Sequence, residues 1–245
     1  MPQIKAIITD YIGTLTNARF YTLDASMNKL HQALSDSGFP TDKQQFLESY
    51  AKAHEKYRLV RYGELREVTN AIWVSEALSN LGYDVAPEDS RMKTALNVFF
   101  QDYVDSLELR PYTKKLLKKI NTVCKLGLLS NFTYAPVVYS SLRKLGIAEF
   151  FNTIAVSGEN GWRKPHRKIF QDTLQRLQVK ADEAVYIGDS PMEDIKGAKA
   201  AGLRTIFVSS QFYNINDLYC SKQEPDLVMT DLKEIYYNFS QITNI

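Results

Sequence analysis

Cysteine and histidine are scarce in this sequence of 245 residues, which contains two cysteines and three histidines. Cys124 and Cys220 lie far apart and give no pattern of paired disulfides. The histidines, His31, His54 and His166, show none of the spacings at which zinc ligands occur. These absences exclude a small disulfide-rich scaffold and a zinc finger, and they favour a reducing compartment.

Long apolar runs and a charge excess of one sign are also missing. No run approaches the roughly 18 apolar residues that a membrane helix needs, and the start, Met-Pro-Gln, lacks the segments of a signal peptide. Lysine and arginine number 30 against 28 acidic residues, far from the concentrated basic field of a nucleic-acid-binding protein. We expect a cytoplasmic protein that binds neither membrane nor nucleic acid. The sequence does not indicate its oligomeric state.

Short apolar runs alternate with helical patterns from residue 111 onward. The runs predict strands at 125–131, 153–158, 184–189, 205–210 and 226–232, with helices at 134–145, from Pro165, and at 191–201. The first apolar run, 4–10, must join the same sheet, because nothing near it offers a partner. Continuous apolar strands alternating with helices are typical of a parallel sheet covered on both faces, which places the protein in the α/β class.

Residues 17 to about 107 follow a purely helical pattern. Four helices are predicted, at about 23–37, 41–58, 64–81 and 88–105, and no segment alternates with period two. Thr41 and Gln44 resemble a capping box at the start of the second helix. We predict a core formed by 1–16 and 108–245, with an inserted four-helix domain at 17–107.

Polar side chains collect where the predicted parallel strands end. Asp10 ends the first strand, Ser130 and Asn131 end the strand at 125–131, and Asp189 ends the strand at 184–189. Lys164 stands at the predicted start of a helix. Each has an ordinary role as a turn or cap residue when taken alone. Because ligands of open parallel sheets bind beyond the carboxyl ends of the strands, together they predict a ligand site at this edge.

These residue types suit the transfer of a phosphoryl group. Asp10, on the tight turn DYIGT, can act as a nucleophile when nearby cations offset the charge of an anionic substrate. The backbone of the turn at Thr14, the Ser130 hydroxyl and the Lys164 ammonium would hold the phosphoryl oxygens.

Carboxylates beside Asp10 predict a magnesium site. Asp189 would supply hard oxygen ligands, which Mg²⁺ prefers. Asp194 is predicted to act as a ligand or to orient one. Glu193, in the first turn of the same helix, is expected to interact favourably with the helix dipole.

Four motifs occur along the chain in the order IITDYIGTLT, LGLLSN, GWRKPHRKIF and VYIGDSPMEDIKGAKAAG. In these motifs the chain resembles the hydrolases of the haloacid dehalogenase superfamily that carry an inserted helical cap. The resemblance extends over essentially the whole chain, although 17–107 matches by position and helicity rather than by motif. It implies a Rossmann-like, doubly wound parallel sheet with a helical cap domain.

The resemblance also implies roles for individual residues. Asp10 corresponds to the covalent nucleophile, with Ser130 and Lys164 holding the anionic substrate and Thr14 and Asn131 beside them. The implied ligands of Mg²⁺ are Asp10, Asp189, Asp194 and the backbone carbonyl of Ile12.

The Ile12 side chain departs from the pattern of the family's phosphatases. These carry a second aspartate at this position, which protonates the leaving oxygen and then activates the hydrolytic water. Loss of such a group costs about 10²–10⁴-fold in rate. The reaction therefore stays open among three classes: a metal-independent 2-haloacid dehalogenase, a phosphatase with a different proton route, and a non-catalytic phosphate-binding protein.

The retained motifs favour the phosphatase. A dehalogenase needs no general acid, because halide leaves without a proton. The dehalogenases of the family, however, use no metal and usually replace the acidic Gly-Asp motif, whereas this chain keeps Asp189. A non-catalytic protein would have no need for Lys164 or Asp189. Phosphonoacetaldehyde hydrolases also carry an apolar residue at the Ile12 position, but no motif supports that assignment. We carry forward Mg²⁺-dependent hydrolysis of a small phosphorylated metabolite through an aspartyl-phosphate on Asp10.

Overall fold

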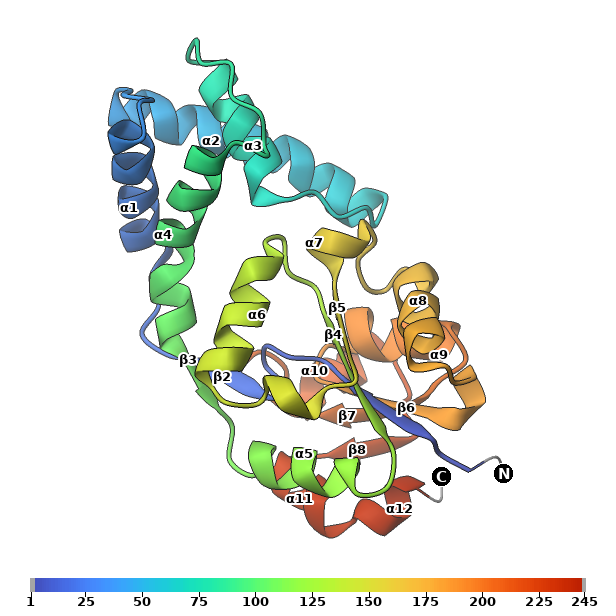
Figure 1. Ribbon diagram of the computed structural model, residues 1–245. Helices are drawn as coiled ribbons and strands as arrows, with labels where there is room; N and C mark the ends of the chain where they lie inside the picture. Colours follow the sequence, from blue (N-terminus) through green and yellow to red (C-terminus); the bar gives the residue numbers. More distant parts are fainter. Residues whose placement is uncertain (1–2, 244–245) are drawn as a thin grey trace.

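A computed structural model describes residues 3–243 of the protein. Its central sheet has six strands in the order β5-β4-β1-β6-β7-β8 (Figure 1), and every neighbouring pair is parallel. The strands are β1 (Ala6–Thr9), β4 (Lys125–Ser130), β5 (Thr153–Val156), β6 (Ala184–Gly188), β7 (Arg204–Val208) and β8 (Leu227–Met229). The chain winds outward from β1 on one side and then on the other, which confirms the predicted doubly wound α/β core.

Strand β1 lies in the middle of this sheet and fixes the position of the polar edge. It pairs with β4 on one side and β6 on the other, with Thr9 opposite Ile187 of β6. All four β1 residues are buried, as expected of a strand covered on both faces. Since the three strands run in the same direction, Asp10, Ser130 and Asp189 emerge at one edge of the sheet.

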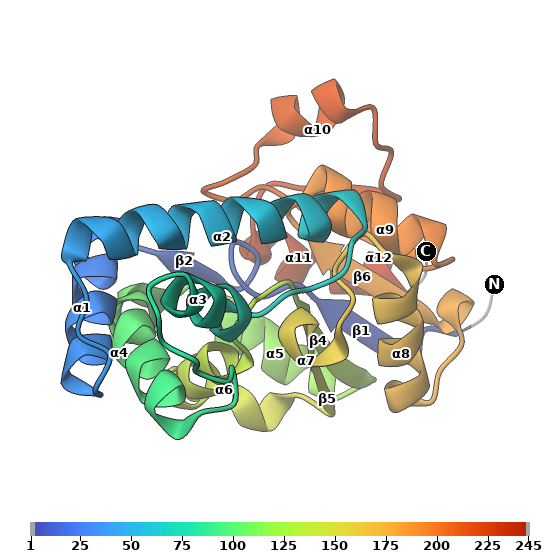
Figure 2. The same cartoon turned by 90° about the horizontal axis from the view of Figure 1, so that it is seen from above.

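Helices cover both faces of the sheet (Figures 1 and 2). Ile7 packs into a buried cluster with residues of α5 (Thr113–Asn121), α6 (Ala135–Lys144), α11 (Leu232–Tyr237) and α12 (Phe239–Thr243). Ile8 faces the opposite way, into a cluster with α8 (Arg167–Leu177) and α9 (Lys196–Ala200). Successive residues of β1 therefore serve two cores, which explains why its apolar residues, Ala6, Ile7 and Ile8, follow one another without alternation.

Shorter elements complete this part of the chain. They are α7 (Ser157–Asn160), α10 (Ile215–Ser221), the 3₁₀ turns Ala148–Phe150 and Ala181–Glu183, and a π-helical turn at Pro191–Ile195 that leads into α9.

Four helices form a separate layer beside the sheet, here called the helical unit (Figures 1 and 2). They are α1 (Leu23–Asp36), α2 (Lys43–Gly63), α3 (Asn70–Ser79) and α4 (Ser90–Ser106). The unit has its own core, which includes Leu30, Phe46, Trp73 and Leu96. A two-stranded antiparallel ribbon, β2 (Thr16–Ala18) with β3 (Leu107–Leu109), joins it to the sheet. Within residues 3–243 no helix has the length and apolar character to cross a membrane.

Several predicted boundaries were wrong. The third helix of the unit begins at Asn70 rather than at 64, because residues 64–68 run beside the loop 161–163 and Leu65 has a left-handed backbone (φ 56°). The second begins after Asp42, whose carboxylate accepts the Gln45 N–H bond, so the predicted Thr41 capping box is absent. Lys164 does not open a helix, since α8 starts at Arg167 and Lys164 lies in the preceding loop.

Candidate active site

Asp10 follows β1 and lies close to two carboxylates, that of Asp189, which follows β6, and that of Asp194. Its backbone N–H donates to Ile187 O at 2.9 Å, which continues the β1–β6 ladder by one residue. Gly13 then turns the chain with φ 97°, a backbone conformation that favours glycine. A side chain at Gly13 would also collide with the Asp189 carboxylate. The glycine of DYIGT is therefore required both by the turn and by the close approach of Asp189.

The Lys164 ammonium is the centre of the buried polar cluster. Its Nζ donates to Asp10 Oδ1 at 2.7 Å and to Asp194 Oδ1 at 2.6 Å. It also donates to Tyr186 Oη at 3.0 Å and to Leu129 O at 3.2 Å. Burial works against its charge, but the two carboxylates outweigh burial and raise the pKa of Lys164. The lysine is thus a fixed cation beside Asp10.

Asp194 is held from both sides. Its Oδ2 accepts the backbone N–H bonds of Asp189 (3.1 Å) and Ser190 (2.9 Å), while Oδ1 also accepts the Tyr186 hydroxyl at 2.9 Å. Gly188 makes room for it, since a Cβ there would overlap the Asp194 carboxylate. Both Asp194 oxygens therefore already accept hydrogen bonds, and the carboxylate fixes the turn that carries Asp189.

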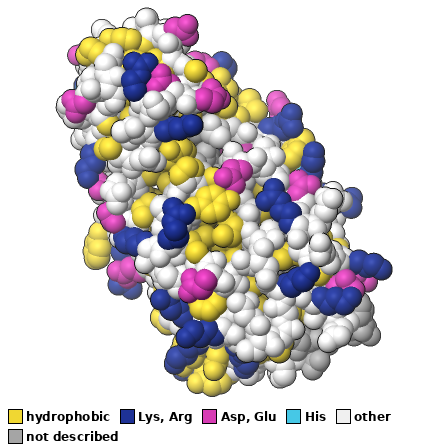
Figure 3. All heavy atoms as spheres, viewed as in Figure 1, with side chains coloured by type: hydrophobic (Ala, Val, Ile, Leu, Met, Phe, Trp, Pro, Cys, Tyr) yellow, Lys and Arg dark blue, Asp and Glu magenta, His cyan; other side chains and the backbone are white. Residues whose placement is uncertain are grey.

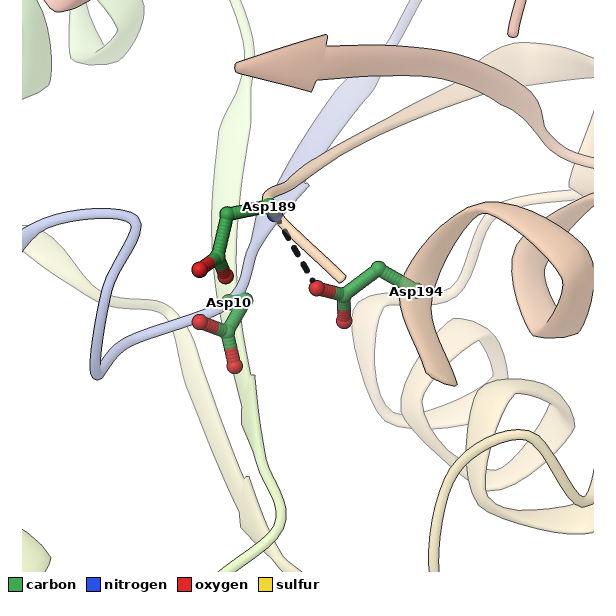
Figure 4. A group of neighbouring side chains, drawn as sticks. All are labelled: Asp10, Asp189 and Asp194. Carbon is green, nitrogen blue, oxygen red and sulfur yellow. Dashed lines mark hydrogen bonds between the residues drawn. The ribbon is translucent and has the colours of Figure 1, made fainter. Parts of the chain in front are cut away.

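The Asp189 side chain lies next to that of Asp10 (Figure 4). Its Oδ1 accepts the Thr14 hydroxyl at 3.1 Å, and its Oδ2 accepts the Ser210 hydroxyl at 2.6 Å. Oxygen atoms of Asp10, Asp189 and Asp194 all lie within 4.8 Å of one another, and all three residues are buried. Three hard oxygen donors at this spacing fit a divalent cation such as Mg²⁺.

Burial of these carboxylates changes their protonation. Desolvation raises the pKa of Asp10 to about 6, although Lys164 acts to lower it. Desolvation, together with the charges of Asp10 and Asp194, raises the pKa of Asp189 to about 8. A bound cation would favour the charged forms, so metal binding at this cluster is linked to proton release.

The metal-free protein is therefore expected to lose stability as the pH rises from about 4 to about 8. In this range the folded protein keeps a proton on Asp189 that the unfolded chain releases, so the free energy of unfolding falls with rising pH. Thermal unfolding midpoints in EDTA from pH 5 to pH 8 measure this fall, and Mg²⁺ at pH 8 should reverse it. Asp189→Asn should flatten the profile; an unchanged slope in this variant would contradict the account.

A small cavity of about 100 Å³ lies over the carboxylates. Its lining includes Asp10, Ile12, Ser130, Lys164 and Asp189, and also Asn131, Ser190, Glu193, Asp194, Phe212 and Tyr213. Asp10 Oδ2 has no hydrogen-bond partner among the described residues, whereas Oδ1 is bound to Lys164. Asp10 thus lines this cavity, and one of its two carboxylate oxygens is left without a partner.

Two residues predicted to bind substrate also have side chains that bond within the protein. The Asn131 amide clamps the backbone of Lys164, with Oδ1 accepting its N–H at 2.8 Å and Nδ2 donating to its carbonyl at 3.0 Å. The Thr14 hydroxyl is bound to Asp189. Glu193, expected to interact with a helix dipole, forms an ion pair with Arg163 at 2.8 Å and accepts the Asn131 amide.

Sequence reasoning missed three supporting residues. Tyr186 bonds Lys164 and Asp194, Ser210 bonds Asp189, and Arg110 donates to the carbonyls of Gly13 and Ser209. Ser210 follows β7 at the same edge of the sheet, so its place at the end of a predicted strand could have identified it from the sequence. Tyr186 and Arg110 had none, because a buried strand tyrosine and a loop arginine have many ordinary roles.

The fold and this cluster define an α/β protein with a buried aspartate–lysine pair and an acidic site at the carboxyl edge of its sheet. A family model described as haloacid dehalogenase-like hydrolase matches residues 4–202. The chain belongs to this family of hydrolases, which confirms the resemblance seen in its motifs.

Relatives of known name lie within the same family. A glyceraldehyde 3-phosphate phosphatase of Methanothermobacter thermautotrophicus is 28% identical, over 95% of this chain and 100% of its own. A ribulose-1,5-bisphosphate 5-phosphatase of Halopiger xanaduensis is 26% identical over 69% of this chain and 70% of its own. Among solved structures, a 2-haloacid dehalogenase of Pseudomonas syringae superposes with a TM-score of 0.70 at 22% identity, covering 98% of this chain and 99% of its own. At that identity the likeness shows the fold.

Proposed function

We propose that the protein is a Mg²⁺-dependent phosphatase of a small phosphorylated metabolite, with Asp10 as the nucleophile. The observation that carries this proposal is the Asp10 carboxylate itself, which is buried, bound to Lys164 through Oδ1 at 2.7 Å and without a partner at Oδ2. The names of the relatives support it, since they are phosphatases of small sugar or triose phosphates.

In the proposed reaction Asp10 Oδ2 forms a bond to phosphorus while the bond to the leaving oxygen breaks, and the leaving oxygen takes its proton from water because Ile12 has none to give. Water then attacks the aspartyl-phosphate and releases phosphate, which restores the carboxylate. The Lys164 ammonium and the Ser130 hydroxyl would offset charge on the phosphoryl oxygens, with Thr14 and Asn131 keeping Asp189 and Lys164 in place. Lys164 also keeps Asp10 ionised at neutral pH by direct ion pairing.

Asp10, Asp189, Asp194 and the Ile12 carbonyl are the residues that would hold Mg²⁺. The carboxylates fit the ion because they are hard oxygen donors within 4.8 Å of one another. The ion would supply charge neutralisation for the approach of an anionic substrate.

We also propose that 17–107 acts as a cap on the core formed by 1–16 and 108–245, and that the protein works in the cytoplasm. The β2–β3 ribbon spans both predicted boundaries and gives the helical unit a narrow two-stranded connection to the sheet. Closure of such a unit would exclude water from the cavity during the reaction.

Ile12→Asp is expected to raise the rate of phosphate release by roughly tenfold or more, because a carboxyl at this position restores a general acid and base. Ile12 is one of the residues that line the cavity beside Asp10, so a carboxyl at this position would lie near the leaving oxygen. Initial rates with an alkyl phosphate and with an aryl phosphate measure the effect, which should be larger for the poorer, alkyl leaving group. Ile12→Asn is the matched control, since it adds polarity without a proton to transfer. An equal or lower rate in the aspartate variant would show that the site uses a different proton route.

A panel of phosphorylated metabolites assayed for free phosphate with Mg²⁺ and with EDTA tests the function directly. The proposal requires release that depends on Mg²⁺. The rival reaction, suggested by the absence of an acid at Ile12, is dehalogenation, and halide release from 2-haloacids in EDTA would establish it instead.

A further inference from the structure

The loop that carries Lys164 is joined to the helical unit by backbone hydrogen bonds. Arg163 N–H donates to Leu65 O and Glu67 N–H donates to Gly161 O, both at 3.1 Å. The Glu67 carboxylate accepts the Ser157 hydroxyl at 2.6 Å. The connection between α2 and α3 thus lies against the core like a short added strand, beside α7 in Figures 1 and 2.

The Arg163 side chain contacts both the helical unit and the core, at the place where these backbone hydrogen bonds join them. Its guanidinium lies 4.2 Å from the centroid of the Tyr62 ring, on α2, and donates from Nη2 to Glu193 Oε1 at 2.8 Å. Arg163 is 3% exposed, so the guanidinium is buried between two partners that lie nearer the surface. Tyr62 belongs to the helical unit and Glu193 lines the cavity, so Arg163 connects the helical unit with the cavity wall.

From Glu193 the contacts continue to the nucleophile without a break. Glu193 Oε2 accepts the Asn131 amide at 2.9 Å, and Asn131 in turn holds the N–H and the carbonyl of Lys164. The Lys164 ammonium then binds Asp10 at 2.7 Å. Tyr62, Arg163, Glu193, Asn131 and Lys164 therefore form one chain of contacts from α2 to the Asp10 carboxylate.

Stability alone does not account for Arg163. Its Nε and Nη1 atoms have no hydrogen-bond partner among the described residues, so a buried guanidinium makes few of the bonds it can donate. Burial works against the Arg163 charge, but Glu193 and Glu67 outweigh it and raise the pKa of Arg163. Apolar residues of similar volume nevertheless often fill such a position at least as stably as a buried ion pair. A cation that contacts Tyr62 of α2 and Glu193 of the cavity wall is instead suited to couple the positions of these two parts.

We propose that Arg163, Glu193 and Asn131 are positioning residues that couple the docking of α2, through Tyr62, to the placement of the Lys164 ammonium beside Asp10. Undocking of Tyr62 loosens Arg163 and then the Asn131 clamp, so the reacting pair is fully assembled only while the helical unit is docked. The inference rests on the proposed function for the identity of the reacting pair. Coupling along such a chain is established by non-additive effects of paired substitutions.

The kinetic test uses Tyr62→Leu, Glu193→Gln and the double variant. Each single variant should lower kcat about tenfold or more with KM changed by less than about twofold, since small displacements of a catalytic group have large effects. The double variant should be no slower than the slower single variant. Tyr62→Phe keeps the ring over Arg163 and should lose much less activity than Tyr62→Leu. Rate losses that multiply in the double variant, or a raised KM with unchanged kcat, would overturn the proposal.

Hydrogen exchange tests the coupling without any substrate. The Lys164 amide donates to Asn131 Oδ1, so its exchange rate reports the clamp directly. Tyr62→Leu should raise this rate about tenfold while the amides of β1 keep their protection, which shows that the fold is intact. Unchanged exchange at Lys164 would refute the coupling. A wild-type protein that releases no phosphate from any compound would refute only the proposed function.

Discussion

Replacing Asp10 by asparagine is expected to lower the rate of phosphate release by about 10⁴-fold or more, as loss of a covalent nucleophile does in other hydrolases. The amide has nearly the same shape but no anionic oxygen to attack phosphorus, and it weakens the acidic cluster that would hold Mg²⁺. Initial rates at saturating Mg²⁺, with the best compound of the metabolite panel, measure the loss.

The loss should not come from unfolding. Burial raises the pKa of Asp10 to about 6, so its charge at pH 7.5 opposes folding, and a neutral amide should leave the thermal midpoint unchanged or higher. Asp24→Asn, an exposed aspartate in the first turn of α1, is the matched control and should keep the wild-type rate. An Asp10→Asn protein with more than about one tenth of the wild-type rate would mean that water attacks the substrate directly.

Lys164→Met is expected to lower the free energy of unfolding by about 3–5 kcal/mol in EDTA, because it leaves buried carboxylates without their cation. Lys164 is 2% exposed and bonds Asp10 and Asp194 at 2.7 and 2.6 Å. Urea unfolding at pH 7.5 measures this change. Phosphate release should fall as well, since the methionine cannot offset charge on the transferred group.

Mg²⁺ should recover part of the stability that Lys164→Met loses but little of the activity. A cation held by the carboxylates would supply positive charge to the folded state, but it would not replace the ammonium that the proposed reaction uses to offset charge on the phosphoryl oxygens. Lys118→Met, at an exposed position of α5, should stay within about 0.5 kcal/mol of the wild type. A Lys164→Met protein as stable as this control would contradict the role of the lysine as the central buried cation.

The parallel sheet and its polar edge were predictable because apolar periodicity and strand order are local signals. The runs at β1, β4 and β6 are mainly apolar and lead to Asp10, Ser130 and Asp189. The polar edge was therefore predictable once the strands were taken as parallel. The membership of the hydrolase family also followed from the motifs, and it is confirmed by the family model over residues 4–202.

The supporting contacts were not predictable, because they depend on tertiary packing. The segment with Lys164 looked like a helix start, yet Lys164 lies in a turn that bonds to Asn131, and the α2–α3 connection bonds to the residues just before it. Glu193 has the local pattern of a dipole-stabilising residue, and only the folded chain brings Arg163 to it. Residues 64–69 have helical periodicity, but their docking on the core overrides it.

The most direct test of the central claim is the mass of the peptide that contains Asp10 during a single turnover. Protein in excess over a phosphorylated substrate is mixed with Mg²⁺, quenched in acid at successive times and digested. The account predicts that this peptide gains the mass of one phosphoryl group before free phosphate appears, and loses it at the rate of phosphate release. Phosphate release at the full rate with an unmodified Asp10 peptide at every time would contradict it.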